Sequence, residues 1–298
     1  MEKNTVINNG RVKFYAKSQV LIDLCLMIIE GNNVSNINHD INVYVGIHQW
    51  LFEKIPNNIL SIGIQTEQLY DDTGKRISNH RYSYSTIFYQ NKFDIIVDLS
   101  KSNYLAYTGK NIIFGPYIFP ESCVTYDLNN INSYNGIFFG HLSERRVYIL
   151  NNLPNIFNIN IANGFYYNEL MPLIRDSKFV LNIHNEEGKY TEWPRLLLAY
   201  LRGKSLVSEN LCSELLPGTH YILIGDHIDE KKLKNVFDNI TEDFCSKYSF
   251  INLLNKIESF NISRKNRFIN LFNLVVLLIQ ILFIKITNKI LFFYGIKN

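Results

Sequence analysis

The sequence predicts an α/β fold of two domains that face a cleft, and three observations lead to this prediction. The chain has 298 residues, a length that suits two domains of about 150 residues, each with its own core. Short apolar runs alternate with amphipathic helical stretches, which is typical of parallel sheets with right-handed crossovers. Several of these runs end in polar or charged residues, so a binding site is expected at the carboxyl edge of a sheet.

The first domain is expected to span residues 1–135 and to alternate strands with helices. An amphipathic helix is expected over residues 18–30 and ends at Gly31. The strands expected in this domain lie at 12–15, 43–47, 59–64, 93–99 and 111–114. Glu67 and Asp98 lie where two of these strands end, so both are expected to face the cleft.

A polar and poorly periodic stretch at 121–136 is expected to link this domain to a second one over residues 136–262. The second domain opens with a short strand that Gly140 ends, followed by a helix that Ser143 caps. This order of strand, glycine and helix start lets a phosphate approach backbone amides and the positive end of the helix.

Two arginines, Arg145 and Arg146, lie in the first turn of that helix. Arginine at this end opposes the helix macrodipole, so a bound anion would explain why both are present. The alternative is an ordinary surface helix with solvated arginines.

A strand, a polar loop, a helix and another strand are expected in succession later in this domain. His184 ends the first of these strands and Glu209 follows the second, so both are expected at the carboxyl edge of the sheet. Thr191 is expected to cap the helix, which places Glu192 and Arg195 at its start. Carboxylates at such positions can accept hydrogen bonds from sugar hydroxyls, and Arg195 can pair with a diphosphate. A structural Arg–Glu pair on the helix and a buried or solvent-facing histidine are the alternatives.

The composition fits a folded cytoplasmic protein, with 47% hydrophobic and 19% charged residues. The N-terminus is polar and lacks the apolar core of a signal peptide. No G-x-G-x-x-G follows the first strand, which argues against a dehydrogenase or an epimerase. Four cysteines are spaced neither for zinc nor for a disulfide framework and fit a reducing compartment: Cys25, Cys123, Cys212 and Cys245.

The last segment, 263–298, is basic and apolar, and without its six cationic residues the rest of the chain has 24 basic and 27 acidic side chains. Residues 268–284 are uncharged, which is at the lower limit of about 17 residues for spanning a bilayer. Three amides interrupt this window: Asn270, Asn273 and Gln280. A helix lying on an anionic membrane surface is therefore favoured over a helix packed on the domains or a transmembrane helix.

Three stretches together resemble one known family. They are SIGIQTEQLYD at 61–71 with FDIIVDLSKSN at 93–103, IFFGHLSERRVYIL at 137–150, and KFVLNIHNEEG with TEWPRLLLAYLRGKSLVSE at 178–209. Their sequence and order are similar to those of bacterial GT-B-type glycosyltransferases related to the spore maturation protein CgeB. The resemblance covers about half of the chain. It implies two Rossmann-like domains, with the nucleotide-sugar donor held mainly by the second domain and the acceptor by the first.

The resemblance also implies roles for the candidate residues. The donor phosphates would lie at Gly140, Arg145 and Arg146, and the nucleotide and sugar would be lined by His184, Glu192, Arg195 and Glu209. Glu67 is the first choice for the base that activates the acceptor, and Asp98 the second.

The implied reaction needs no cofactor beyond the donor substrate. No Asp-x-Asp occurs in the chain, so fixed positive charges rather than a metal are expected to stabilise the leaving diphosphate. Expected partners are the nucleotide-sugar, a cell-surface glycan, lipid-linked or protein acceptor, and the inner face of the cytoplasmic membrane, with no nucleic acid. A non-catalytic GT-B-like binding subunit at the membrane is the alternative.

Overall fold

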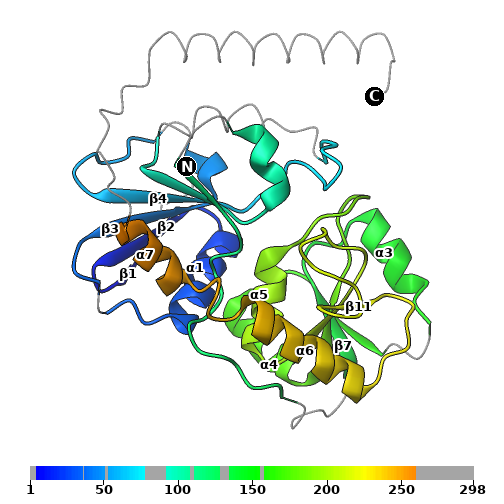
Figure 1. Ribbon diagram of the computed structural model, residues 1–298. Helices are drawn as coiled ribbons and strands as arrows, with labels where there is room; N and C mark the ends of the chain where they lie inside the picture. Colours follow the sequence, from blue (N-terminus) through cyan, green and yellow to red (C-terminus); the bar gives the residue numbers. More distant parts are fainter. Residues whose placement is uncertain are drawn as a thin grey trace, which may run out of the picture.

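The computed structural model describes residues 5–35, 37–50, 53–77, 92–107, 111–127, 134–154 and 158–259. These residues form two lobes, each built on one sheet with helices packed against it (Figure 1). One sheet has six strands and the other five, and all strand pairs except one are parallel. The predicted α/β fold with parallel sheets is therefore confirmed.

The first lobe contains the six-stranded sheet, in which the strands follow one another in sequence order. Its strands are β1 (Thr5–Asn9), β2 (Val12–Ala16), β3 (Ile41–Val45), β4 (Leu60–Gln65), β5 (Ile95–Asp98) and β6 (Ile112–Phe114). Its helices are α1 (Gln19–Gly31) and the 3₁₀ helices η1 (Ile47–Trp50) and η2 (Lys101–Ala106). Strand β1 pairs antiparallel with β2 and was not expected, although an Asn-Gly pair is a common hairpin signal.

The third strand ends two residues earlier than the sequence pattern predicted. Strand β3 stops at Val45, and Ile47 begins η1 instead of continuing the strand. Gly46 makes this turn at φ +69°, and a Cβ at this position would lie 2.3 Å from a methyl carbon of Leu21. Glycine is therefore needed here both for its conformation and for the close approach of α1.

The second lobe contains the five-stranded parallel sheet, with strand order β11-β10-β9-β7-β8. Its strands are β7 (Tyr134–Phe139), β8 (Ile159–Ala162), β9 (Ser177–Asn182), β10 (Ser205–Ser208) and β11 (Ile222–Leu223). Its helices are α3 (Glu144–Asn151), α4 (Tyr167–Arg175), α5 (Trp193–Leu201) and α6 (Glu230–Phe244). Helix α5 is buried along almost its whole length, so it forms the centre of the core that both lobes share.

The last described helix, α7 (Phe250–Ser259), returns to the first lobe (Figure 1). The ring of Phe250 packs 5.4 Å from that of Phe14 in β2, and the Ile251 amide donates to Asn32 Oδ1 at 3.3 Å. The sequence placed these residues in the second domain. Amphipathic periodicity identifies the helix but does not reveal which sheet its apolar face covers.

Side chains of α1 connect the two lobes. Asp23 Oδ2 accepts a hydrogen bond from the Tyr167 amide at 3.1 Å, at the first residue of α4. Arg202 Nη1 donates to Glu30 Oε1 at 2.7 Å, and its Nη2 donates to the Tyr167 hydroxyl at 2.8 Å. The two lobes are thus held by charged contacts as well as by apolar packing.

The expected membrane helix of the segment 263–298 lies outside the described residues. Within the described part of the chain, none of the helices combines the length and the apolar character that crossing a bilayer requires.

Candidate functional site

A cleft of about 810 Å³ lies between the lobes, and both contribute to its walls. From the first lobe it is lined by α1 and by the loop that follows β4. From the second lobe come the ends of β7 and β8, the loop 185–192 and the start of α5. The carboxyl ends of strands from both parallel sheets therefore open into one cavity, which is where ligands bind in open α/β sheets.

Glu67 lies in the loop after β4 and lines the cleft, as predicted. Its carboxylate has no hydrogen-bond or ion-pair partner among the described residues. The Glu67 side chain is exposed to solvent in the open cleft, and the enclosing walls and the negative charge of Glu192 both raise its pKa. A carboxylate without a partner and with a raised pKa is suited to accept a proton from a bound ligand.

Asp98 does not face the cleft, and the prediction that it would is wrong. Its side chain is 0% exposed and accepts hydrogen bonds from Tyr107 Oη at 2.6 Å, the Ser100 amide at 2.9 Å and Asn103 Nδ2 at 3.0 Å. Asn103 Nδ2 also donates to the Glu67 carbonyl at 2.8 Å. Asp98 therefore holds Asn103, which in turn holds the loop that carries Glu67.

Burial raises the pKa of Asp98 to about 7, although its three hydrogen-bond donors favour the charged form. A raised carboxyl pKa means that the folded state binds the proton more tightly than the unfolded state does. The proton on Asp98 therefore stabilises the folded state. This stabilisation is complete below pH 3.8 and is lost as the pH rises through about 7.

We therefore expect the free energy of unfolding of the wild type, minus that of Asp98→Asn, to fall between pH 5 and 8. The fall should be about 3 kcal/mol, since one pKa unit corresponds to about 1.4 kcal/mol. Urea denaturation at a series of pH values measures the difference, and other titrating groups cancel in it. A difference in the free energy of unfolding that does not vary with pH would contradict the raised pKa of Asp98.

Arg145 pairs with Glu209 across the edge of the second sheet. Its Nη1 donates to Glu209 Oε2 at 2.9 Å and to the His184 carbonyl at 2.8 Å, and its Nη2 forms an ion pair with the same carboxylate. Burial alone would raise the pKa of Glu209, but Arg145 and the His184 amide lower it overall. The sequence suggested that a bound anion balances the positive charge of Arg145. In the structure the carboxylate of Glu209 balances it.

Arg146 and Arg195 share a second carboxylate, that of Glu192. Arg146 Nη2 lies 2.9 Å and Arg195 Nη1 2.8 Å from its oxygens. Arg146 also donates to the carbonyls of Ile183 and His141, at 2.8 and 3.0 Å. Arg195 donates to the Phe139 carbonyl at 3.0 Å and to Asn182 Oδ1. The two guanidinium groups thereby tie together the ends of β7 and β9.

Gly140 follows β7 and lines the cleft, and its φ of +119° favours glycine. A Cβ here would lie 2.9 Å from Arg195 Nη2 and 3.7 Å from Arg146 Nη1. The glycine therefore makes room for Arg195, while 3.7 Å to Arg146 is an ordinary van der Waals contact. Its contact with donor phosphates stays a prediction.

His184 is buried and does not line the cleft. Its Nε2 lies 3.0 Å from the Asn210 carbonyl, and its ring packs 4.1 Å from that of Tyr190. Burial lowers the pKa of His184, so the ring is neutral and Nε2 carries the proton that the carbonyl accepts. Nδ1 has no partner within the described ranges. His184 thus supports the loop behind the cleft, and its role beside a diphosphate stays a prediction.

Helix α5 starts later than predicted. Glu192, not Thr191, is the N-cap, and no side chain caps the first turn. Thr191 Oγ1 instead accepts from the Cys212 amide at 3.4 Å, and its own amide donates to Gln68 Oε1 at 3.0 Å. Pro194 lies in the first turn, where its missing amide hydrogen costs no intrahelical bond.

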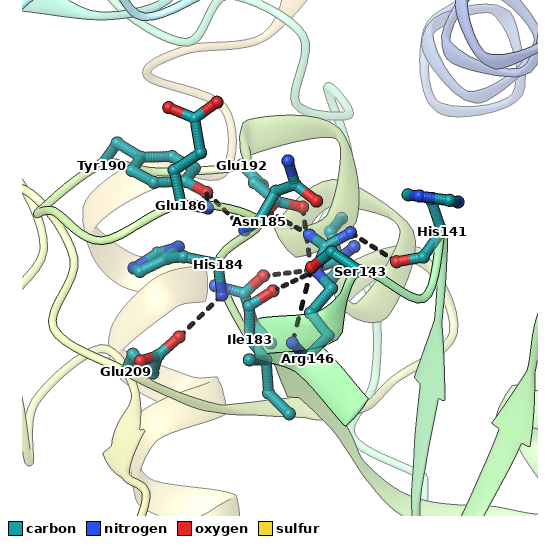
Figure 2. Close-up of polar contacts among 12 residues, drawn as sticks. His141, Ser143, Arg146, Ile183, His184, Asn185, Glu186, Tyr190, Glu192 and Glu209 are labelled. Carbon is teal, nitrogen blue, oxygen red and sulfur yellow. Dashed lines mark hydrogen bonds and ion pairs between the residues drawn. The ribbon is translucent and has the colours of Figure 1, made fainter. Parts of the chain in front are cut away.

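Several residues that line the cleft were not identified from the sequence as part of a site. They are His141 after β7, the loop Asn163 to Tyr166 after β8, and Asn185, Glu186 and Tyr190 after β9. The Tyr190 hydroxyl accepts from the amides of Asn185 and Glu186, at 2.6 and 3.3 Å, and so closes that loop (Figure 2). The position of each loop just after a strand is the signal that could have identified them.

The described part of the chain contains no group of three His, Cys, Asp or Glu side chains arranged to hold a metal ion. The adjacent acids Asp71 and Asp72 serve the local fold. Asp71 Oδ1 accepts from the Thr73 and Lys75 amides, each at 2.9 Å, and Asp72 Oδ2 accepts from the Ser213 amide at 2.6 Å. Metal independence stays a prediction.

No protein-family model matches the sequence, and no curated protein matches it. Among solved structures, TarM from S. aureus in a complex with UDP has a TM-score of 0.48 and 13% identity, over 73% of this chain and 55% of TarM. HepE from Anabaena, also with UDP, has a TM-score of 0.48 and 9% identity, over 81% of this chain and 82% of HepE. A UDP-forming trehalose-phosphate synthase from Burkholderia xenovorans has a TM-score of 0.44 and 9% identity, over 87% and 90% of the two chains.

The chain spans a little over half the length of the TarM structures it matches, 55 and 59%. With identities of 9 to 13%, the roles of individual residues rest on the geometry of this chain.

Proposed function

We propose that this chain is a glycosyltransferase that moves a sugar from a nucleotide-sugar donor to a glycan, lipid-linked or protein acceptor. One observation carries the proposal: Glu67 extends from the first lobe, with no partner among the described residues and a raised pKa, into a cleft lined by the strand ends of both sheets. A two-substrate transfer needs such a cavity, in which one lobe holds each substrate and a base lies between them.

In this proposal Glu67 accepts the proton of the acceptor hydroxyl as that oxygen attacks the sugar. A general base is most effective when its pKa lies near the working pH, and the raised pKa brings Glu67 closer to that condition. Asn103 and Asp98 act as positioning residues, because they fix the backbone of the loop that carries Glu67.

The leaving diphosphate would lie at the start of α5 and the turn at Gly140. The positive end of α5 points to this edge, although the amides of Arg195 and Leu196 already donate to the Glu192 carbonyl, so an anion would interact mainly with the helix dipole. Arg195 adds a buried positive charge at the same edge. These fixed positive charges would stabilise the leaving diphosphate, as a metal ion does in other transferases.

The alternative is a GT-B-like subunit that binds a sugar-nucleotide or a glycan without turnover. It is favoured by the pairing of Arg145, Arg146 and Arg195, all of which bind carboxylates or carbonyls of the chain itself. A diphosphate would have to compete with Glu192 and Glu209 for these groups. The two functions share the cleft but differ in whether Glu67 matters for more than binding.

A donor panel separates these functions. We expect one of the UDP-, GDP- or CMP-linked sugars to raise the melting temperature of the full chain by about 5 °C at a hundredfold excess over Kd. The same donor should be hydrolysed slowly without an acceptor. A shift without hydrolysis or transfer would favour the binding subunit. Neither shift nor hydrolysis with any donor would refute the transferase and would leave a glycan as the only ligand of the binding subunit.

A further inference from the structure

The chain crosses between the two lobes twice, and the crossings run side by side. The first crossing follows β6, and the second leads from α6 to α7. Phe119 and Ser249 form a parallel bridge between them. The Phe119 amide donates to the Tyr248 carbonyl at 3.1 Å, and the Phe250 amide donates to the Phe119 carbonyl at 3.3 Å. Any rotation of one lobe against the other must bend both segments at this place.

Each crossing carries a cysteine close to the bridge. Cys123 is exposed on the first crossing, and Cys245 is buried at the end of α6, where the second begins. Cys245 Sγ lies 3.7 Å from the Pro120 carbonyl, which also accepts from the Ser246 amide at 3.3 Å. Ser246 has a φ of 57°, so the chain turns sharply just after the cysteine.

Contacts of Pro120 and Tyr200 bring the two cysteines close to each other. The Tyr200 hydroxyl accepts a hydrogen bond from the Val124 amide at 3.3 Å, next to Cys123, and it also interacts with the thiol of Cys245. Pro120, three residues before Cys123, contacts Cys245 Sγ through its carbonyl. Residues 122 positions apart in the sequence are thus neighbours, and Cys123 is near enough to raise the pKa of Cys245.

We propose that Cys123 and Cys245 are a redox modification site, at which a low-molecular-weight disulfide such as oxidised glutathione converts the two thiols into a reversible disulfide. The thiolate of Cys123 attacks one sulfur of the oxidant, which forms a mixed disulfide and releases one thiol. Cys245 then loses its proton and attacks the Cys123 sulfur, which releases the second thiol. Two protein thiols are oxidised, and one oxidant disulfide is reduced to two thiols.

The order of these steps follows from exposure. Burial and the neighbouring Cys123 raise the pKa of Cys245 to about 11, so Cys245 is not the thiol that reacts first with the oxidant. Cys123 is the sulfur that an oxidant in solution can reach. The other cysteines, Cys25 and Cys212, are 0% exposed, and neither has another cysteine as a contact among the described residues.

The disulfide would fasten the two crossings to each other beside the bridge. It would limit the bending that a change in the angle between the lobes requires, because neither segment could shift without the other. This inference concerns the lobes and their connection and does not depend on the proposed function.

The test treats the full chain with oxidised glutathione, blocks free thiols by alkylation and maps disulfides by mass spectrometry without reduction. We expect one linked pair of peptides that contain Cys123 and Cys245, with Cys25 and Cys212 alkylated only after denaturation. Dithiothreitol should remove the link, and Cys123→Ser should prevent it. The oxidised wild type should melt about 5 °C or more above the reduced protein, because the link closes a long loop.

Two outcomes would overturn the inference. One is a mixed disulfide on Cys123 that persists and is never resolved by Cys245. The other is a link from Cys123 to a different cysteine, or a link between two chains. Because Cys123 is exposed, Cys123→Ser is expected to fold, and its melting temperature should not change upon oxidation.

Discussion

Replacement of Glu67 with Gln is expected to lower kcat/KM for sugar transfer by about 10²- to 10⁴-fold, the range that a positioned general base contributes. The amide has nearly the same shape as the carboxylate but cannot accept the proton. Donor binding should persist, because Glu67 belongs to the first lobe and the expected donor groups to the second. Transfer assays together with donor-induced shifts in melting temperature measure the two effects separately.

The pH dependence of the transfer rate offers a second test of Glu67 as the base. Deprotonated Glu67 is the active form, so the rate should fall as the pH drops through the pKa of this group. Desolvation and Glu192 raise that pKa above 4.5, so the acidic limb should lie at a higher pH than for an ordinary glutamate. The limb should be absent from the residual activity of Glu67→Gln.

Glu242→Gln is the matched control, since Glu242 is exposed on α6 and does not line the cleft. Its activity and its pH profile should equal those of the wild type. If Glu67→Gln keeps full activity, the base is another residue. Parallel loss of donor binding and activity would instead assign Glu67 a structural role.

The second large effect is expected from Arg195→Ala, which should lower the free energy of unfolding by about 3–5 kcal/mol. Arg195 is 8% exposed and is bonded to Glu192, Asn182 and the Phe139 carbonyl. Without the guanidinium group, Asn182 and the Phe139 carbonyl would keep their desolvation cost and lose this donor, and Glu192 would be left with Arg146 alone. Urea denaturation measures the loss.

Arg11→Ala provides the comparison for this experiment. Arg11 forms its ion pair with Asp40 at 3.8 Å, and the two side chains are 59 and 61% exposed. Exposed pairs contribute about 1 kcal/mol or less, so this variant should unfold almost like the wild type. If Arg195→Ala lowers the free energy of unfolding by less than about 1 kcal/mol, the buried contacts of Arg195 do not stabilise the fold.

The sequence was sufficient for the features that depend on local pattern. Ser143 caps α3 as expected, because its Oγ accepts from the Arg146 amide at 3.4 Å. Gly203 follows the end of α5 with a φ of +68°, the left-handed conformation in which glycine commonly ends a helix. Glu67 lines the cleft because a strand end in a parallel sheet fixes its position. These features depend on neighbours within a few residues.

The features that could not be predicted depend on partners far away in the sequence. Arg145 and Glu209 are 64 residues apart, and Arg146 and Glu192 are 46 apart. The helix macrodipole correctly indicates that arginines at the start of α3 need negative charge, but it does not reveal whether a ligand or a carboxylate of the chain supplies it. Asp98 shows the same limit, because its burial depends on how η2 folds over the end of β5.

The return of α7 to the first lobe has a consequence for folding. Phe250 completes a core that contains Phe14, so the first lobe depends on a segment that leaves the ribosome after the whole second lobe. During synthesis, the second lobe can therefore finish folding while the first still exposes apolar surface to chaperones or to other chains. The lobe that is synthesised first is expected to be the one that is completed last.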